Sequence, residues 1–355
     1  MDPPRRAGRR PRRAGRRPRL PELPEVETLR RDLAAAVAGR TIEEVRRPGL
    51  KGPRVPSDPA AFDQGLTGGL VTGVRRRGKL LLVELVASVD GHAPTGGLPT
   101  GEVPGTSTGA RLLAIHLGMS GQLLLDVPLR PGEVGSPGPP SPSSRRGAVG
   151  EARSRHPRSG EVAALGSRPA HTQLELGFAD GAVLHFVDPR RFGWFGSATA
   201  GEAEQALPQL GRLGVEPLDP AFSSAELARL LTGRRARLKS WLLDQRRLAG
   251  IGNIYSDEIL FAARLRFDRT GAGLTSREVR RLHGSIRAVL EAAIAARGSS
   301  LADAQYRDLG GRPGTFQLQH AVYGRAGAPC TRCGRPITRA VVGGRSCFFC
   351  PRCQR

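Results

Sequence analysis

Residues 21–27 read Pro21-Glu22-Leu23-Pro24-Glu25-Val26-Glu27 and stand between an arginine-rich leader and an amphipathic stretch. The apolar residues of that stretch recur at steps of three and four: Val26, Leu29, Leu33 and Val37. With acidic residues in the first turn, this spacing predicts a helix that extends to about Ala38. An amine just before the helix would lie at the positive end of its dipole, which lowers the amine's pKa and favours the unprotonated form.

Pro21 is the nucleophile that this stretch suggests. Only a free secondary amine can attack carbon and form an iminium, so Pro21 would have to be the first residue of the working protein. Residues 1–20 hold nine Arg and one Asp and cannot form a core. Three interpretations of this leader stay open: a translated artefact upstream of the true start, a nucleic-acid-binding tail, or a targeting segment. Leu20 favours the first, because a leucine codon can initiate translation as Met, and removal of that Met would expose Pro21.

The chain as a whole is strongly basic, with 55 Lys and Arg against 32 Asp and Glu and a formal net charge of +23. Without the +8 of the leader, the remaining residues still carry +15, which favours a polyanionic partner over a charge that serves only solubility. No run approaches the roughly eighteen apolar residues of a membrane-spanning helix. The leader also lacks the apolar segment of a secretory signal. We therefore expect a cytoplasmic protein that does not associate with membranes.

Strand patterns fill the chain from Thr41 to Phe195. Apolar runs between glycine-containing turns predict strands at 70–74, 80–86, 112–116, 122–125, 173–178 and 183–187. Many strands with short turns and few helices favour an antiparallel sandwich. Residues 88–109 and 127–170 are rich in Pro, Gly, Ser and Arg without apolar period, so two long mobile inserts are expected there.

From about Ser223 the pattern becomes helical. Helices are predicted at 225–231, 238–243 and 255–263, and a capping box of Thr275 and Glu278 precedes a long helix that ends near residue 298. The fold is therefore expected to be α+β with two domains. The expected divisions are a leader at 1–20, a sandwich domain at 21–200, a helical domain at 215–320 and a metal-bound finger at 321–355.

Four cysteines with paired spacing lie near the end of the chain: Cys330, Cys333, Cys350 and Cys353. Two Cys-x2-Cys pairs match the tetrahedral coordination of one structural Zn²⁺ with no open position. Two disulfides would not suit a reducing compartment. Cys347 is expected to pack as an apolar-like side chain. Between the pairs, Arg345 would lie on a turn held by the metal and suited to a phosphate, unless it is one solvated arginine among many.

Gly250-Ile251-Gly252-Asn253-Ile254-Tyr255 lies between two predicted helices. The glycines predict a tight turn, and the backbone N–H groups after it, with the Asn253 amide, could hold a phosphate of a nucleic acid. A glycine loop alone is a weak signal. Here it follows a basic segment that contains Arg234, Arg235, Arg237 and Lys239.

Two further loops combine glycine with residues that could enter a base stack. The segment 116–121 places Met119 in a glycine-flanked turn, where it could act as a wedge, although core packing is the ordinary role of methionine. The segment 188–193 offers Arg190 and Phe192 together. Such a pair can hydrogen-bond to an orphaned base and stack in place of an expelled one.

In this order, these motifs resemble those of the bacterial formamidopyrimidine-DNA glycosylases. The resemblance rests on residues 21–25, Lys79 in Arg77-Gly78-Lys79-Leu80, and the segments 116–121, 188–193, 250–258 and 330–353. It covers residues 21–355 apart from the two inserts. It implies an N-terminal helix and β-sandwich, a helix-two-turns-helix domain, and a C-terminal β-hairpin zinc finger with one structural Zn²⁺. It also implies that a monomer binds damaged duplex DNA in the basic cleft between the domains.

The resemblance implies a role for each of five residues near the reaction. Pro21 would attack C1′ of the damaged nucleotide, and the resulting Schiff base would undergo β,δ-elimination that nicks the strand. Glu22 would exchange protons with the ribose during ring opening. Glu25 would shape the damaged-base site, and Lys79 would assist elimination at a phosphate. Arg345 would bind the phosphates around the lesion and serve the δ-step.

Other residues would bind DNA. The residues implied to fill the space left by the extruded nucleotide are Met119, Arg190 and Phe192. The residues implied to contact DNA are His116, His171, Arg190, Arg235, Lys239 and Asn253. Residues 299–313 correspond to the family's base-reading loop but are too divergent for specific contacts to be transferred.

The implied activity is the removal of oxidised purines, 8-oxoguanine and formamidopyrimidines, in base excision repair. The related oxidised-pyrimidine endonucleases share the architecture but typically begin Pro-Glu-Gly-Pro, whereas Leu23 stands here. The Arg190/Phe192 pair also favours the purine branch. An alternative of a different class is a non-catalytic zinc-dependent DNA-binding protein, which would require a retained leader that blocks Pro21.

Overall fold

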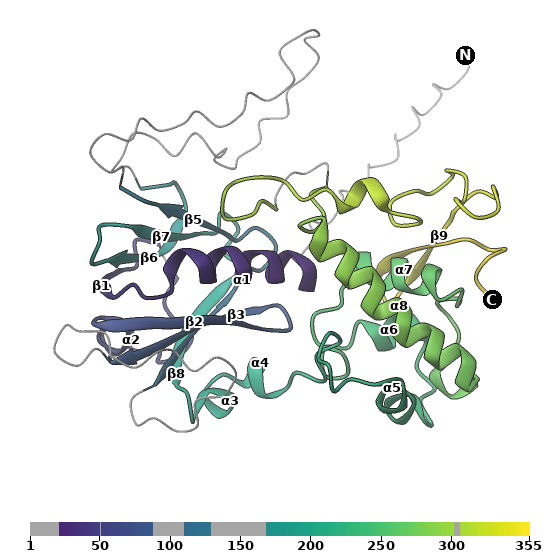
Figure 1. Ribbon diagram of the computed structural model, residues 1–355, viewed down its shortest axis with the longest axis horizontal. Helices are drawn as coiled ribbons and strands as arrows, with labels where there is room; N and C mark the ends of the chain where they lie inside the picture. The colour runs from purple at the N-terminus through teal and green to yellow at the C-terminus, as the bar shows by residue number, and fades with distance from the viewer. Residues whose placement is uncertain (1–20, 50, 88–109, 129–167, 302–305) are drawn as a thin grey trace, which may run out of the picture.

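The computed structural model describes residues 21–49, 51–87, 110–128, 168–301 and 306–355, and divides them between a β-sandwich and a helical half (Figure 1). The predicted leader, the insert at 88–109 and most of the insert at 127–170 lie outside the described residues, as do residues 302–305. The predicted α+β fold is confirmed. Within the described residues, no helix is both long and apolar enough to cross a membrane.

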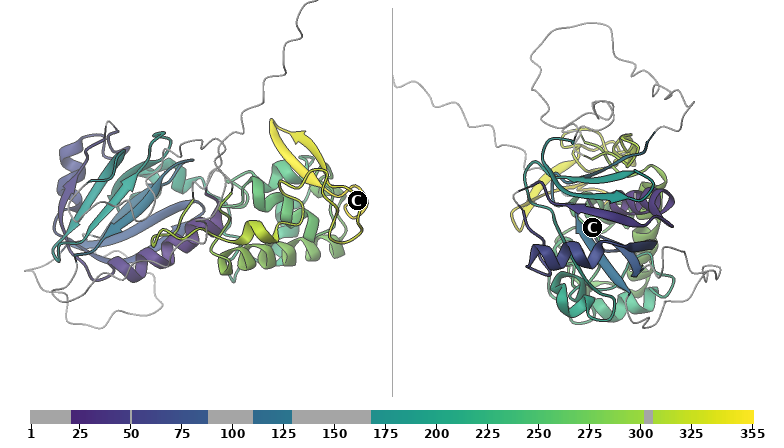
Figure 2. Two further views of the ribbon diagram at one scale, coloured as in Figure 1. Left: turned by 90° about the horizontal axis from the view of Figure 1, so that it is seen from above. Right: turned by 90° about the vertical axis from the view of Figure 1, so that its left-hand side faces the viewer.

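Helix α1 (Leu23–Val37) begins and ends close to the predicted positions, with Glu22 as its N-cap residue. Pro24 lies in the first turn, where a backbone N–H would have no acceptor within the helix, so a proline breaks no hydrogen bond there. The four predicted apolar positions are buried in the core of the sandwich. Leu23, in contrast, belongs to the core of the helical half. Figure 2 shows α1 running from the junction of the two halves into the sandwich.

Two four-stranded antiparallel sheets form the sandwich. The first has the order β2 (Gly69–Arg77), β3 (Leu80–Ala87), β4 (Arg111–His116), β8 (Trp194–Thr199). The second has the order β1 (Ile42–Arg46), β6 (Thr172–Phe178), β7 (Val183–Val187), β5 (Gln122–Asp126). The six predicted strands are confirmed. The register pairs Leu80 with His116 and His116 with Trp194, so the turn between β2 and β3 lies beside the end of β4.

The elements that the pattern did not single out are β1, β8 and the helix α2 (Pro59–Leu66). The sequence of β1, Ile-Glu-Glu-Val-Arg, exposes its acidic residues and buries only Ile42 fully, so its apolar signal is weak. Helix α2 is only eight residues long and starts with a proline, but Asp58 caps it by accepting hydrogen bonds from the N–H groups of Ala60 and Ala61. Two short helices, α3 (Ala203–Ala206) and α4 (Pro208–Gly211), follow β8.

The helical half contains α5 (Ser224–Leu231), α6 (Leu238–Leu242), α7 (Asn253–Ala262) and α8 (Ser276–Ala295). Two single-turn helices, η1 (Gly271–Gly273) and η2 (Phe316–Gln319), lie in its loops. The predicted capping box is present, because Thr275 and Glu278 each accept a hydrogen bond from the other's backbone N–H. Shortly after α8 ends at Ala295, Arg297 and Gly298 adopt positive φ angles of 58° and 80°, which a continuing helix does not allow.

The C-terminal finger is a hairpin of β9 (Thr338–Val342) and β10 (Arg345–Phe349). Gly343 and Gly344 connect the strands with φ angles of 55° and 73°, the left-handed conformation that a two-residue hairpin turn requires at both positions. The hairpin joins the core of the helical half through the buried residues Cys347, Phe348 and Phe349 of β10. The finger therefore packs on α7 while its turn stays exposed.

Candidate active site and zinc site

Glu22 lies where α1 meets α7, and its carboxylate binds the first turn of α7. Oε1 accepts a hydrogen bond from the N–H of Ile254 at 2.9 Å, and Oε2 accepts one from Tyr255 at 3.3 Å. The positive end of the helix dipole stabilises a carboxylate at this place. Gly252 permits the approach, because a Cβ there would lie 2.2 Å from the carboxyl carbon of Glu22.

The glycine loop therefore binds a different anion from the one predicted. We expected the N–H groups at the start of α7 to hold a DNA phosphate, but Glu22 already occupies those of Ile254 and Tyr255. The start of α7 does bind an anion, as predicted, but that anion is the carboxylate of Glu22. Asn253 donates from Nδ2 to Tyr323 Oη at 3.4 Å, and its Oδ1 has no hydrogen-bond partner in the described part of the chain.

Glu25 lies one turn further along α1 and is 2 % exposed. Its Oε2 accepts a hydrogen bond from the N–H of Glu22 at 2.9 Å, and its Oε1 accepts from Tyr255 Oη and from the N–H of Ser299, the latter at 2.7 Å. Burial, together with the charge of Glu22, raises the pKa of Glu25 to about 7. Because Ser299 begins the segment that we expect to read the base, Glu25 ties that segment to α1.

Lys79 lies in the turn between β2 and β3, close enough to Glu22, Glu25 and Arg345 to interact with their charges. Burial lowers the pKa of Lys79, the two carboxylates oppose this effect, and Arg345 adds to it. Arg345 itself is exposed beside the turn of the finger hairpin, and Pro21 is half-buried next to Glu22. The fold thus brings together three parts of the chain that are distant in sequence, namely the segment of Pro21 and Glu22, Lys79, and Arg345.

His116 ends β4 beside Lys79, as the strand register requires. Its Nδ1 accepts a hydrogen bond from the N–H of Gly118 at 3.1 Å, so the neutral ring carries its proton on Nε2. The ring stacks on Trp194 with the two centroids 6.0 Å apart. Burial, reinforced by the charge of Lys79 and by Arg54 and Lys51, lowers the pKa of His116 to about 4. The imidazole is therefore neutral at neutral pH, and Nε2–H is a donor.

The loops at 116–121 and 188–193 pack against each other. Ser120 Oγ donates a hydrogen bond to Asp188 Oδ1, and Asp188 Oδ2 accepts one from the N–H of Gly193 at 2.7 Å. A Cβ on Gly118 would lie 2.3 Å from the nitrogen of Gly193, so only glycine allows this approach. Asp188 is completely buried, which makes it the centre of this contact.

The packing of the two loops presents the three predicted void-filling side chains together. Arg190 lies over the ring of Phe192, with 4.8 Å between the guanidinium carbon and the ring centroid. Phe192 is 48 % exposed and Met119 is half-buried. His171 is also nearby, because its carbonyl accepts a hydrogen bond from the N–H of Asp188 at 3.0 Å, and its side chain is exposed.

Lys239 does not lie where we expected. Its side chain is completely buried, and Nζ donates hydrogen bonds to Asp257 Oδ1 at 2.6 Å and to the carbonyl of Ser346 at 3.1 Å. A phosphate cannot reach this enclosed ammonium, so the expected contact of Lys239 with the DNA backbone is corrected to an internal ion pair. Arg235, in contrast, is exposed between α5 and α6, as a DNA contact requires.

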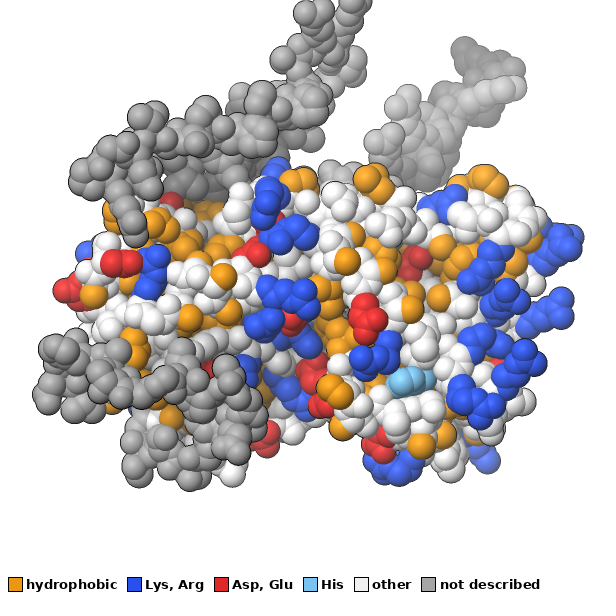
Figure 3. Space-filling view, in the orientation of Figure 1, with side chains coloured by type: hydrophobic (Ala, Val, Ile, Leu, Met, Phe, Trp, Pro, Cys, Tyr) orange, Lys and Arg blue, Asp and Glu red, His pale blue; other side chains and the backbone are white. Residues whose placement is uncertain are grey.

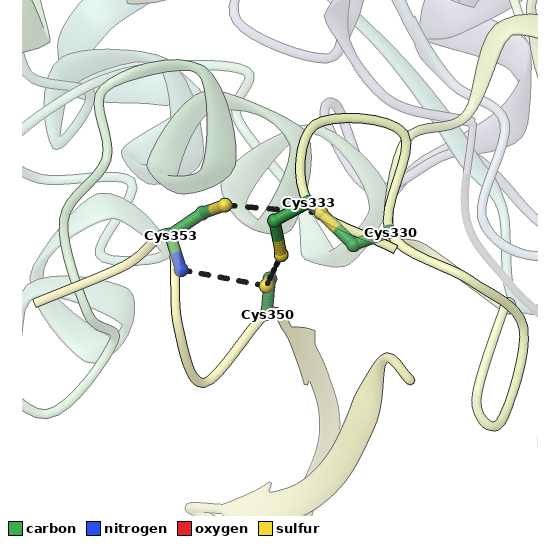
Figure 4. A group of neighbouring side chains, drawn as sticks. All are labelled: Cys330, Cys333, Cys350 and Cys353. Carbon is green, nitrogen blue, oxygen red and sulfur yellow. Dashed lines mark hydrogen bonds between the residues drawn. The ribbon is translucent and has the colours of Figure 1, made fainter. Parts of the chain in front are cut away.

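The four predicted cysteine ligands converge at the base of the finger (Figure 4). Their sulfur atoms all lie within 4.8 Å of one another, with 3.9 Å between Cys330 and Cys353 and 3.5 Å between Cys333 and Cys350. Two sulfurs on one tetrahedral Zn²⁺, each about 2.3 Å from the metal, would lie about 3.8 Å apart, whereas a disulfide requires about 2.05 Å. The cluster fits one structural Zn²⁺ and does not fit two disulfides.

Cys347 stands apart from this cluster. It is completely buried, as expected of a packed side chain, and its Sγ donates a hydrogen bond to Asp257 Oδ1 at 3.3 Å. Burial and the charge of Asp257 raise the pKa of the thiol, which keeps it protonated.

The buried acids of α7 hold neighbouring segments in place, and the sequence analysis did not single them out. Asp257 binds Lys239, and Glu258 accepts hydrogen bonds from three consecutive backbone N–H groups, at 321–323, over 2.7–3.0 Å. Burial raises the pKa of Glu258, and these donors oppose the shift. Two adjacent acids within an otherwise apolar helix could have indicated that both are buried and bound.

Comparison with known proteins identifies the family. Residues 20–195 match the formamidopyrimidine-DNA glycosylase N-terminal domain, residues 213–305 match its H2TH domain, and residues 327–355 match a zinc finger found in FPG and IleRS. This chain belongs to the formamidopyrimidine-DNA glycosylase family. The formamidopyrimidine-DNA glycosylase of Thermus thermophilus is 38 % identical over 337 residues, which cover 94 % of this chain and 98 % of the relative. That of Heliobacterium modesticaldum is 39 % identical over 338 residues, covering 95 % and 100 %.

Solved structures of formamidopyrimidine-DNA glycosylases agree with the fold. The crystal structure of the MutM (Fpg) protein from Thermus thermophilus aligns with a TM-score of 0.68 and 38 % identity over 94 % of this chain and 98 % of that one. A complex between the Lactococcus lactis Fpg and DNA that contains an abasic site aligns with a TM-score of 0.70 and 28 % identity, over 94 % and 99 %.

Proposed function

We propose that this protein is a bifunctional DNA glycosylase and abasic-site lyase of base excision repair that removes oxidised purines from duplex DNA. The observation that carries this proposal is the convergence of Pro21, Glu22, Lys79 and Arg345 at the junction of the two halves. Relatives named formamidopyrimidine-DNA glycosylase support the substrate class, and so does a solved relative in complex with DNA that contains Fapy-dG. Figure 3 shows Lys and Arg side chains gathered over the helical half and near its junction with the sandwich, a distribution that suits a polyanionic partner.

Pro21 supplies the nucleophile. Its amine forms a bond to C1′ of the damaged nucleotide and loses its proton, while the base leaves with the electron pair of the glycosidic bond and is protonated. Glu22 then protonates O4′ as the C1′–O4′ bond opens, which leaves an iminium between Pro21 and C1′. Loss of a C2′ proton expels the 3′ phosphate, and a second elimination expels the 5′ phosphate. Lys79 and Arg345 bind these phosphates and stabilise their charge as they leave.

Residues away from the reacting carbon hold the opened duplex. Met119, Arg190 and Phe192 fill the space left by the extruded nucleotide, which offsets part of the cost of unstacking it. His116 donates from Nε2 to a phosphate. The other backbone contacts of this proposal are His171, Arg235 and Asn253. The enzyme acts as a monomer on DNA in the cytoplasm, where one structural Zn²⁺ bound by the four cysteines shapes the finger that carries Arg345.

This chemistry requires a free amine on Pro21. We therefore propose that the working form begins at Pro21. The family match supports this, because it starts at residue 20 and leaves the arginine-rich residues before it unmatched.

Borohydride trapping tests the proposal. Protein that begins at Pro21 should become covalently linked to an 8-oxoguanine duplex and should nick it, because reduction fixes the iminium. A matched control carries one glycine before Pro21, which turns the amine into an amide and should abolish trapping while leaving DNA binding. If the Pro21 form binds the duplex but neither traps nor nicks it, the enzyme function is lost. Faster cleavage of an oxidised-pyrimidine duplex would overturn the purine preference alone.

A further inference from the structure

The ion pair between Lys239 and Asp257 has no role in the chemistry proposed above, yet it is the most deeply buried ion pair among the described residues. Both side chains are 0 % exposed, with 2.6 Å between Nζ and Oδ1. Burying two charges costs free energy that their attraction alone often does not recover, so such a pair is weak support for stability. The reason for this ion pair therefore has to be sought in the groups that Lys239 and Asp257 contact.

The pair binds strand β10 at three consecutive residues. Lys239 Nζ donates a hydrogen bond to the carbonyl of Ser346 at 3.1 Å. Asp257 accepts hydrogen bonds from Cys347 Sγ at 3.3 Å and from the N–H of Phe348 at 2.9 Å. Since β9 and β10 form a two-stranded sheet, β9 pairs with only one edge of β10. The ion pair binds the other edge.

Arg345 is the residue immediately before this bound segment. It is exposed and forms no ion pair within the described residues, so its direction depends on the backbone that carries it. The zinc cluster fixes β10 at its far end, where Cys350 follows Phe349. The ion pair fixes the strand at the end nearer to Arg345.

We propose that Lys239 and Asp257 are positioning residues that hold β10 and thereby direct Arg345 towards the phosphate that leaves in the δ-step. This inference rests on the proposed lyase function. It also accounts for the burial of a lysine in the basic segment that precedes the glycine loop. Burial raises the pKa of Asp257 to about 6 and the charge of Lys239 opposes this shift, so the Asp257 carboxylate is ionised at neutral pH.

The partition between elimination products tests this role, because a residue that only stabilises the fold would not change it. Single-turnover reactions would use zinc-loaded protein that begins at Pro21 and a duplex with one abasic site. The variants are Asp257→Asn and Lys239→Met, with Arg345→Ala as the reference and Arg335→Ala as the matched control. Arg335 is an exposed arginine of the same finger, so its loss removes an equal charge away from the ion pair. Zinc content and melting temperature report folding.

We expect both ion-pair variants to retain borohydride trapping and the first elimination. The δ-step should slow about 10- to 100-fold, because displacing a positioned group such as the Arg345 guanidinium by about 1 Å has an effect of this size. Arg345→Ala should show the same change and Arg335→Ala should show none. An unchanged partition in folded Asp257→Asn, or an equal fall in both eliminations, would overturn the proposal. If Asp257→Asn does not fold, Lys239→Arg serves instead. It keeps the charge but changes the length and shape of the side chain, and it must still change the partition between the two elimination products. Absence of trapping by the parent protein would instead refute the proposed function.

Discussion

Replacing Glu22 with Gln should separate two uses of one carboxylate. In the structure, its two oxygens accept hydrogen bonds from the N–H groups of Ile254 and Tyr255 at the start of α7. In the proposed reaction, the same group protonates O4′. Glutamine has nearly the same shape, but it keeps one acceptor oxygen and turns an NH2 group towards the second donor.

The expected loss of stability follows from these two contacts. A hydrogen bond to a charged group contributes about 1.5–3 kcal/mol, and a buried donor left without a partner costs about 1–3 kcal/mol. A charge at a helix end contributes up to about 2 kcal/mol when partly buried. The variant avoids the cost of burying a carboxylate, which offsets part of this loss, so we expect a net decrease of about 2 kcal/mol. For a domain of this size, that lowers the melting temperature by about 4–8 °C.

Glu258→Gln provides the matched control, because Glu258 is also a buried carboxylate that accepts hydrogen bonds from backbone N–H groups, those of residues 321–323, but has no place in the proposed chemistry. Both variants should melt at lower temperature in thermal unfolding followed by circular dichroism. Only Glu22→Gln should lose a general acid, which lowers the single-turnover rate of strand cleavage by about 10²- to 10⁴-fold. If the two variants lose activity equally, Glu22 is not the acid. If Glu22→Gln melts like the parent protein, its hydrogen bonds to α7 do not stabilise the fold.

Three other changes have defined outcomes. Cys333→Ser should release Zn²⁺ and weaken DNA binding together with activity, and zinc content that stays at one per chain would contradict the four-cysteine site. Lys79→Ala should slow cleavage much more than it lowers the melting temperature, and a variant that fails to fold would show that Lys79 is structural. Glu25→Gln should flatten the pH dependence of stability. The pKa of Glu25 rises from 4.5 to about 7 on folding, so the native state binds the proton more tightly, and the free energy of unfolding falls by about 3 kcal/mol as pH rises through that window. Denaturant titrations from pH 4.5 to 8 measure this slope, and an equal slope in variant and parent would refute the assignment.

Local patterns were enough to predict most of the fold. The spacing of apolar residues in α1, the short apolar runs of six strands and the capping box of α8 each depend on residues within a few positions of one another. The zinc cluster was predictable for a similar reason, because the chemistry of the metal fixes both the residue type and the spacing. The strand β1 was not predicted, because most of its residues face solvent and its sequence therefore shows little apolar pattern.

The contacts that define the site are not local, and the sequence could not indicate them. Glu22 and Ile254 are separated by 232 positions, and neither residue alone shows that one binds the other. The same limit explains the correction for Lys239. A lysine in a basic segment predicts exposure on average, but Asp257, 18 residues later, provides a buried partner that reverses this expectation. The family resemblance indicated which residues matter, whereas the physical role of Lys239 became clear only from its burial.

The position of the proposed nucleophile depends on both halves of the molecule. Most of α1 packs in the sandwich, but the N–H of Leu23 donates to the carbonyl of Gly250 at 3.0 Å, and the side chain of Leu23 lies in the helical core. Glu22 is bound by α7, and Pro21 directly precedes it. A rotation of one half against the other would therefore move Pro21 relative to Lys79, which the sandwich holds in the turn between β2 and β3. The contacts of the first turn of α1 thus make the geometry of the reaction depend on the arrangement of the two halves.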